Sequence, residues 1–180
     1  CGFQLAFITV HMPAYLSDNG FDSSVAAASL SIIGLCNIIG SLTAGHLSGL
    51  YSKKWILTFI YGARSIVIVL FLIIPITTFT VYAFSFATGL LWLATVPPTS
   101  GLVAQMFGLR YMGTLYGIVF LNHQIGSFSG VWLGGYLFDT TGSYDQVWWW
   151  AAIIAAITAI IHVFIDERPV ERLRLAEKVI

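Results

Sequence analysis

Hydrophobic residues run along this chain in long stretches separated by short polar or turn-forming segments. A helix needs about 20 mainly apolar residues to cross a bilayer, and most of these stretches approach or exceed that length. The breaks include SDNG at 17–20, YSKK at 51–54 and Pro75. They leave six expected spans, at residues 1–16, 24–50, 55–74, 79–107, 113–139 and 147–165. The pattern therefore predicts an all-α membrane protein with six transmembrane helices, in which sequence neighbours are antiparallel.

The helical phase of the polar residues divides these spans into two groups. At about 100° per residue, polar and small side chains align on the first, second, fourth and fifth spans. The aligned residues of the first, second and fourth spans include Gln4, His11, Tyr15, Asn37, Trp92, Thr95 and Thr99. On the fifth span His123 lies on a glycine ridge, Gln124 shares the face of Gly113 and Gly117, and Asn122 points elsewhere. We expect these four helices to border a shared cavity, and the third and sixth to pack outside it.

Glycine and proline mark two further features of the spans. Gly126, Gly130 and Gly134 recur every fourth residue, a spacing that allows close helix packing in lipid. Pro97 and Pro98 remove two backbone donors from the fourth span and are expected to bend it beside the cavity. Such a bend either helps gating or is static.

Charge agrees with a membrane location and predicts an orientation. Hydrophobic residues make up 58% and charged residues 9% of the chain, against roughly 25% charged in soluble domains. The net charge is zero, so nothing points to nucleic-acid binding. Seven basic residues fall on one side of the spans: Lys53, Lys54, Arg110, Arg168, Arg172, Arg174 and Lys178. By the positive-inside rule, that side and both ends of the chain are expected to be cytoplasmic, with residues 167–180 forming a C-terminal tail. Glu167 and Arg168 are interpreted as ordinary surface charges.

The segment GHLSGLYSKKWIL, residues 45–57, resembles the signature of the major facilitator superfamily. The match covers Gly45, Leu47 and the pair Lys53–Lys54; it departs at Gly49, where aspartate is usual, and at Ser52, where glycine is typical. Residues 1–20 and 120–145 resemble the first and fifth helices of the C-terminal half in bacterial monocarboxylate-porter-like members. The resemblance implies a twelve-helix transporter that works by alternating access, with residues 1–166 as the second six-helix half and an N-terminal half missing. It also implies a bacterial inner membrane.

Several polar residues are candidates for binding or coupling. An unperturbed imidazole is the side chain that changes its charge near neutral pH, so His11 and His123 are candidates for binding a carboxylate with a proton; alternatively each is a neutral packing residue. Gln4, Tyr15, Asn37 and Gln124 are candidate substrate contacts or interhelical hydrogen-bond partners. For Trp92, core packing is favoured over a place in the cavity wall.

Arg64 is expected near the middle of the bilayer, where a cation needs a partner. It either holds an anionic substrate or donates to carbonyls or a neighbouring helix, and the second role is favoured. The resembling monocarboxylate and oxalate porters usually carry a basic residue on the second or fifth helix of this half. Here those helices offer only Asn37 and His123.

The predicted function is secondary transport of a small organic solute, an organic anion or monocarboxylate, with proton coupling. Its expected partners are the lipid bilayer, the solute and the N-terminal half; no cofactor or metal is expected. One alternative is an intramembrane hydrolase, for which Ser127 near His123 is the only weak pair. A six-helix channel or a receptor-like protein is the other.

Overall fold

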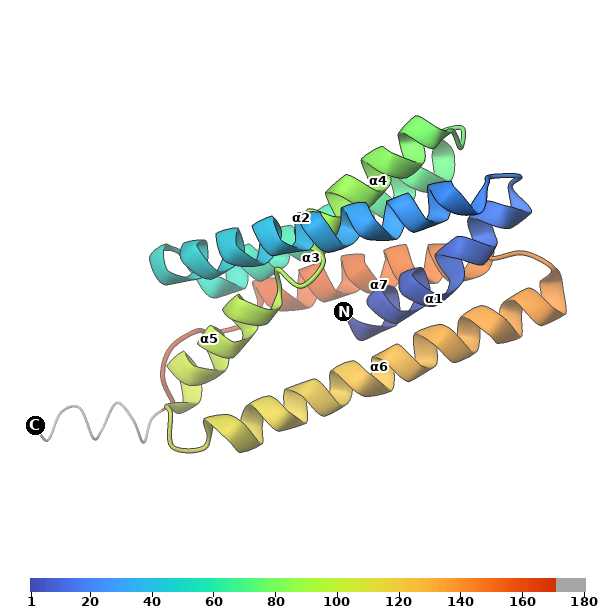
Figure 1. Ribbon diagram of the computed structural model, residues 1–180. Helices are drawn as coiled ribbons and strands as arrows, with labels where there is room; N and C mark the ends of the chain where they lie inside the picture. Colours follow the sequence, from blue (N-terminus) through green and yellow to red (C-terminus); the bar gives the residue numbers. More distant parts are fainter. Residues whose placement is uncertain (171–180) are drawn as a thin grey trace, which may run out of the picture.

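The helices of the computed structural model, which describes residues 1–170, follow one another along the expected spans (Figure 1). The helices are α1 (Gly2–Asp18), α2 (Ser23–Leu50), α3 (Lys53–Ile73), α4 (Thr78–Leu91), α5 (Val96–Phe107), α6 (Met112–Thr141) and α7 (Asp145–Val163). The predicted all-helical fold with six spans is confirmed, because α4 and α5 are the two parts of the fourth span. Residues 171–180 of the predicted tail lie outside the described residues.

Length and hydropathy distinguish the spans from one another. Four segments of the described chain are long and apolar enough to cross a membrane: α2, α3, the α4–α5 pair and α7. By contrast, α1 has 17 residues. In α6 the polar residues Asn122, His123 and Gln124 lower the hydropathy of an otherwise apolar helix of 30 residues.

The helices pack mainly in three pairs. Helix α3 lies along α7, α2 along α4, and α1 along α6 (Figure 1). An aromatic core joins the pairs: Trp148 of α7 is fully buried and meets Phe7 edge-on, with ring centroids 4.9 Å apart. Phe71 of α3 and Phe84 of α4 stack beside it at 4.2 Å. This core fixes α1 and α4 against the α3–α7 pair.

The glycines of α6 lie where α1 approaches it most closely. A Cβ atom on Gly130 would collide with the carbonyl oxygen of Phe3, and one on Gly134 would lie 2.6 Å from the His11 ring. A Cβ on Gly126 would lie 3.3 Å from the Phe3 nitrogen. The backbones of α1 and α6 therefore touch along a ridge that has no room for side chains.

The fourth span is interrupted rather than bent. Helix α4 ends at Leu91 and α5 begins at Val96, so Pro97 and Pro98 stand in the first turn of α5, where a proline costs no helical hydrogen bond. The sequence places the interruption of the fourth span at these prolines, whereas the structure places it before them. The break lies at residues 92–95, immediately before them.

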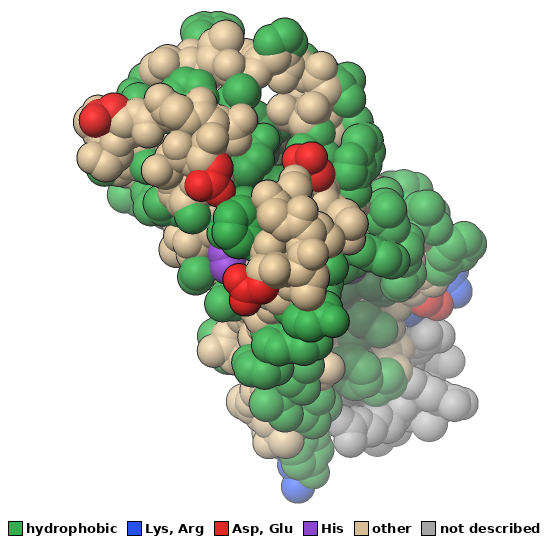
Figure 2. Space-filling model, turned by 90° about the vertical axis from the view of Figure 1, so that its right-hand side faces the viewer, with side chains coloured by type: hydrophobic (Ala, Val, Ile, Leu, Met, Phe, Trp, Pro, Cys, Tyr) green, Lys and Arg blue, Asp and Glu red, His purple; other side chains and the backbone are tan. Residues whose placement is uncertain are grey.

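The two ends of the bundle carry opposite charge. Figure 2 faces the end with the α1–α2 and α6–α7 connections and shows acidic side chains gathered on it. We call this the acidic end; its acids are Asp18, Asp22, Asp139 and Asp145. Asp22 also caps α2, accepting a hydrogen bond from the Ser24 nitrogen at 2.8 Å. The opposite, basic end carries Lys53, Lys54, Arg110 and Arg168.

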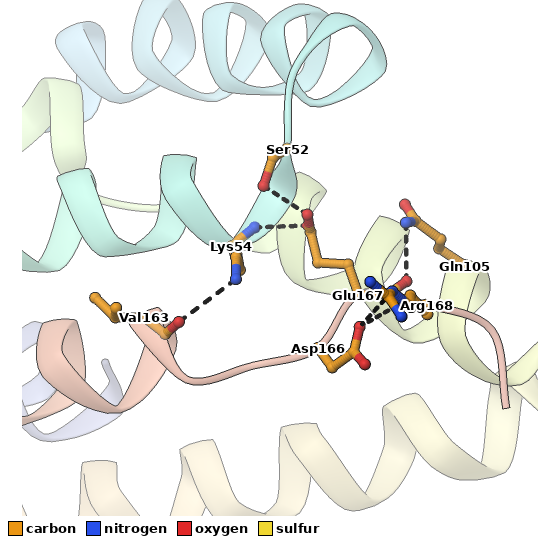
Figure 3. A network of polar contacts seen from close by, with 7 residues as sticks. All are labelled: Ser52, Lys54, Gln105, Val163, Asp166, Glu167 and Arg168. Atoms are coloured by element: carbon orange, nitrogen blue, oxygen red, sulfur yellow. Dashed lines mark hydrogen bonds and ion pairs between the residues drawn. The ribbon is translucent and has the colours of Figure 1, made fainter.

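Glu167 is not an ordinary surface charge, contrary to the prediction from the sequence. Its carboxylate accepts hydrogen bonds from Ser52 Oγ at 2.5 Å and from the Lys54 main-chain nitrogen at 2.8 Å (Figure 3). Ser52 stands at the N-cap of α3 but makes no capping bond itself, so Glu167 supplies that bond from a distant part of the chain. Arg168, in contrast, pairs with Asp166 at 3.7 Å, and both side chains are exposed.

Candidate functional site

A cavity of about 440 Å³ lies where the start of α1 meets α6 and the break between α4 and α5. Its wall is mixed: apolar side chains such as Phe3, Leu93 and Val119 alternate with polar ones. The polar lining residues are Tyr61, Thr95, Thr99, Tyr116, Asn122 and His123. Of the residues that the structure describes, no aspartate or glutamate belongs to the lining. A space of this size and composition suits a small solute that has both an apolar and a polar part.

His123 is the titratable imidazole of this wall. Its ring stacks on that of Phe120, with centroids 5.5 Å apart and planes at 7°. Its main-chain carbonyl is occupied by Ser127 Oγ at 3.1 Å. Among the described residues neither ring nitrogen has a hydrogen-bond partner, so the imidazole is available to a bound solute.

The neighbours of His123 on α6 are distributed differently from the prediction. Asn122, which the helical phase directed elsewhere, also borders the cavity and donates to the Ile118 carbonyl at 2.9 Å. Gln124 is exposed and is not among the lining residues.

Behind the cavity, a buried cation holds the broken helix. Arg64 is only 4% exposed; its Nε donates to the Leu91 carbonyl at 3.1 Å, and Nη2 bonds to the carbonyls of Leu91 and Trp92. Its Nη1 lies 3.2 Å from Cys1 Sγ, and Cys1 lines the cavity. No ion pair to a carboxylate is formed by Arg64 within residues 1–170. Its positive charge is met instead by main-chain carbonyl dipoles, by the Gln4 Oε1 atom at 3.5 Å and by the face of the Tyr61 ring, whose centre lies 5.4 Å away.

Asn37 completes the hydrogen bonding of the break. Its Oδ1 accepts from the Leu93 nitrogen at 2.9 Å and from Ser41 Oγ at 3.3 Å. Backbone groups freed by a break at membrane depth must be satisfied by neighbouring protein groups. Arg64 does this for two carbonyls and Asn37 for one amide. Asn37 is thus engaged with the backbone and is not among the cavity-lining residues.

The predicted contacts of α1 also lie away from the cavity. Gln4 is buried, donates to the Ala151 carbonyl at 2.7 Å and lies 3.5 Å from Arg64 Nη1. His11 Nε2 is 3.0 Å from the Val131 carbonyl, in the α1–α6 interface. Tyr15 packs on Trp148 at 5.6 Å in the aromatic core. Trp92 borders a much smaller hollow together with Gln4, Arg64 and Thr88.

Of the predicted substrate-binding residues, only His123 therefore lines this cavity. The division into inner and outer helices also differs from the expectation: α2 supplies no lining residue, whereas α3 supplies Tyr61 and α7 supplies Ile154. Thr95 and Thr99 of the predicted polar stripe do face the cavity. Nothing in the sequence pattern indicated that Tyr116 lines the cavity. Tyr61 stood out only because it lies close to Arg64 in the sequence.

The segment that carries the sequence signature lies at the basic end. A Cβ atom on Gly45 would meet the Pro97 ring at 3.7 Å, which is ordinary packing distance. Lys53 Nζ donates to Gln105 Oε1 at 2.8 Å, and the Lys54 main chain is held by Glu167. These contacts tie the α2–α3 connection to α5 and to the residues after α7.

Comparison with known sequences identifies the class of protein. The sequence model of the Major Facilitator Superfamily matches residues 1–179, and the chain belongs to this family of membrane transporters. It is therefore an integral membrane protein of a transporter family and not an intramembrane hydrolase.

Its similarity to individual proteins is distant. The chain is 26% identical over 175 residues to the uncharacterized MFS-type transporter YcxA of Bacillus subtilis (strain 168), covering 93% of this chain and 42% of that protein. It is 28% identical to monocarboxylate transporter 12-B of Danio rerio, covering 79% of this chain and 30% of that protein. It is also 28% identical to monocarboxylate transporter 13 of Rattus norvegicus, covering 75% of this chain and 32% of that protein. The chain thus spans less than half the length of each of these relatives.

Proposed function

We propose that this protein moves a small organic anion, such as a monocarboxylate, together with protons by alternating access. We further propose that residues 1–166 form the C-terminal six-helix half of a twelve-helix transporter, followed by a tail at 167–180. Two of the similar proteins are named monocarboxylate transporters, which favours this substrate class. The chain's share of its relatives' length agrees with one half of such a transporter.

The observation that carries the proposal is the electrostatic character of the cavity. His123 and several hydroxyl groups line it, no carboxylate among residues 1–170 does, and the guanidinium of Arg64, which forms no ion pair within those residues, lies directly behind Cys1. Charges interact more strongly in a site shielded from water, so this arrangement favours an anion over a cation. The apolar part of the wall suits the carbon skeleton of a small organic acid.

His123 offers a route for proton coupling. Imidazole changes its charge near neutral pH, and neither nitrogen of this ring has a hydrogen-bond partner within residues 1–170. A protonated ring would hold a carboxylate, and loss of the proton would release it. The alternating exposure of such a site to the two sides of the membrane would couple proton and anion movement. His11, held against the Val131 carbonyl, is the less favoured coupling residue.

The separation of charge between the two ends supports an orientation. Basic residues accumulate at the cytoplasmic ends of membrane helices, so we propose that the basic end and the C-terminal tail are cytoplasmic. The location we propose is a bacterial inner membrane. Labelling of a cysteine placed at Ser143, at the acidic end, tests the orientation: a membrane-impermeant reagent should reach it from outside intact cells.

Uptake by the complete protein tests the transport proposal. The protein would be reconstituted in vesicles and supplied with radiolabelled lactate, pyruvate and a panel of further organic acids, with and without an imposed proton gradient. We expect at least one monocarboxylate to accumulate only when the gradient is present. Downhill flux at channel-like rates with no accumulation would favour the six-helix channel instead. Binding without flux would favour a receptor-like protein.

A further inference from the structure

A second hollow lies outside the cavity, between α2, α3 and the end of α4. It measures about 560 Å³ and shares no lining residue with the cavity. Its walls carry no charged side chain and are largely apolar, with Ala44, Leu47, Trp55, Ile56, Phe59 and Leu90 among them. We call it the α2–α3 groove.

The α2–α3 groove opens onto the apolar surface of the bundle. Its wall residue Phe59 is 70% exposed and Trp55 is 55% exposed, and the nearby Leu42 is 71% exposed. In an integral membrane protein, a surface this apolar is covered by hydrocarbon or by another apolar protein surface. An open groove of this kind has room for one flexible chain that a smooth helix surface would not hold.

One end of the groove reaches the basic end of the bundle. Tyr51, Ser52 and Trp55 form this mouth, and tyrosine and tryptophan are the residues that settle at the level of lipid headgroups. Lys54 Nζ lies 5.4 Å from the centre of the Trp55 ring, and Lys53 precedes it at the start of α3. A lipid whose tail occupied the groove would therefore bring its headgroup close to two ammonium groups.

The positive charges of Lys53 and Lys54 are not neutralised by an ion pair within residues 1–170. Lys53 donates to the neutral side chain of Gln105 and Lys54 Nζ to the Val163 carbonyl at 3.5 Å, and within residues 1–170 neither lysine forms an ion pair. The acid nearest to the mouth, Glu167, has one carboxylate oxygen bonded to Ser52 Oγ and the other to the Lys54 main chain (Figure 3). That carboxylate is used as the cap of α3. An incoming phosphate therefore meets two ammonium groups and one carboxylate, and within residues 1–170 neither ammonium group is paired with that carboxylate.

We propose that the α2–α3 groove binds one acyl chain of an anionic glycerophospholipid, whose phosphate is held by Lys53 and Lys54. A basic residue near a membrane surface contributes attraction equivalent to about a fivefold preference for anionic lipid. The proposal adds a lipid site to the solute site and does not depend on which solute is transported.

Quenching of Trp55 fluorescence by brominated lipid tests this site. The complete protein would be reconstituted in phosphatidylcholine containing a minor share of phosphatidylglycerol with brominated acyl chains. In the mirror experiment the same share of phosphatidylcholine carries the bromine and the phosphatidylglycerol does not. Because the chain has six tryptophans, the signal of Trp55 is taken as the difference between wild type and Trp55→Phe.

We expect brominated phosphatidylglycerol to quench Trp55 more strongly than the same share of brominated phosphatidylcholine. Lys53→Gln with Lys54→Gln should remove this preference, by about fivefold for each lysine. Arg110→Gln removes a charge from the same end without touching the groove and should preserve it. Thr43→Phe, which adds a ring to the groove wall, should lower quenching by the anionic lipid.

Three results would overturn the proposal. Equal quenching by both lipids would show that the headgroup is not selected. If the variant with both lysines replaced is still quenched more strongly by the anionic lipid, the lysines do not bind the headgroup. Trp55 shielded from both brominated lipids would mean that protein, and not lipid, covers the groove.

Discussion

The Oδ1 atom of Asn37 on α2 accepts a hydrogen bond from the main-chain nitrogen of Leu93, 2.9 Å away in the break between α4 and α5. On the other side of the same break, Arg64 of α3 binds the carbonyls of Leu91 and Trp92. The residues after Leu91 bend away from a helical path and become part of the cavity wall at Leu93 and Thr95. A side chain from each of two other helices thus stabilises an irregular backbone that shapes the site.

Replacement of Asn37 tests this bond. Asn37→Leu leaves the Leu93 nitrogen without its acceptor, and an unsatisfied buried donor costs about 1–3 kcal/mol. We expect a loss of that size in the free energy of unfolding, measured by denaturant titration in detergent micelles. Asn122→Leu is the matched control, because Asn122 bonds only to its own helix and is exposed. Equal losses in both variants would contradict a special role for Asn37.

The charge of Arg64 is tested separately from its hydrogen bonds. Arg64→Gln retains a donor but removes the cation. We expect the KM for a carboxylate substrate to rise roughly tenfold, equivalent to about 1.4 kcal/mol, while uptake of its neutral amide analogue stays unchanged. Parallel uptake kinetics with the two solutes in vesicles give this comparison. A similar loss of uptake for both solutes would mean that Arg64 only stabilises the structure and does not attract the substrate.

The contact between α1 and α6 depends on the absence of a side chain at Gly130. Gly130→Leu would drive its Cβ into the Phe3 carbonyl and should separate the two helices, lowering the amount of folded protein and abolishing uptake. Gly135→Leu is the control, because nothing lies within 4 Å of a Cβ at that position. Normal expression and uptake of the Gly130 variant would argue against close packing here.

Glu167 is expected to stabilise the basic end by capping α3. Glu167→Ala removes both of its carboxylate bonds, and loss of a helix cap costs about 1 kcal/mol. Thermal unfolding of the reconstituted protein should therefore show a lower midpoint for Glu167→Ala than for Asp166→Ala, whose carboxylate makes only exposed contacts with Arg168. Identical unfolding midpoints would mean that Glu167 stabilises the protein no more than an ordinary surface charge does.

The sequence predicted the six spans because apolar length and the placement of charge determine them locally. It placed the interruption of the fourth span at Pro97–Pro98 and not at residues 92–95, because residues 92–95 contain neither glycine nor proline, and the adjacent prolines serve equally well to begin a helix. Periodicity placed His11 and His123 on polar faces but could not tell which neighbour would cover each face. The partners of Arg64 and Asn37 are main-chain atoms 27 and 56 residues away, and such atoms leave no trace in side-chain patterns.

His123→Ala in the complete transporter provides the most direct test of the proposed coupling. Accumulation of labelled monocarboxylate against its gradient would be measured in vesicles under an imposed pH difference, beside exchange of the same solute with no pH difference. We predict that His123→Ala abolishes accumulation and spares exchange, and that Gln124→Ala, one residue along the same helix, preserves both. Accumulation at the wild-type level in His123→Ala would contradict the account.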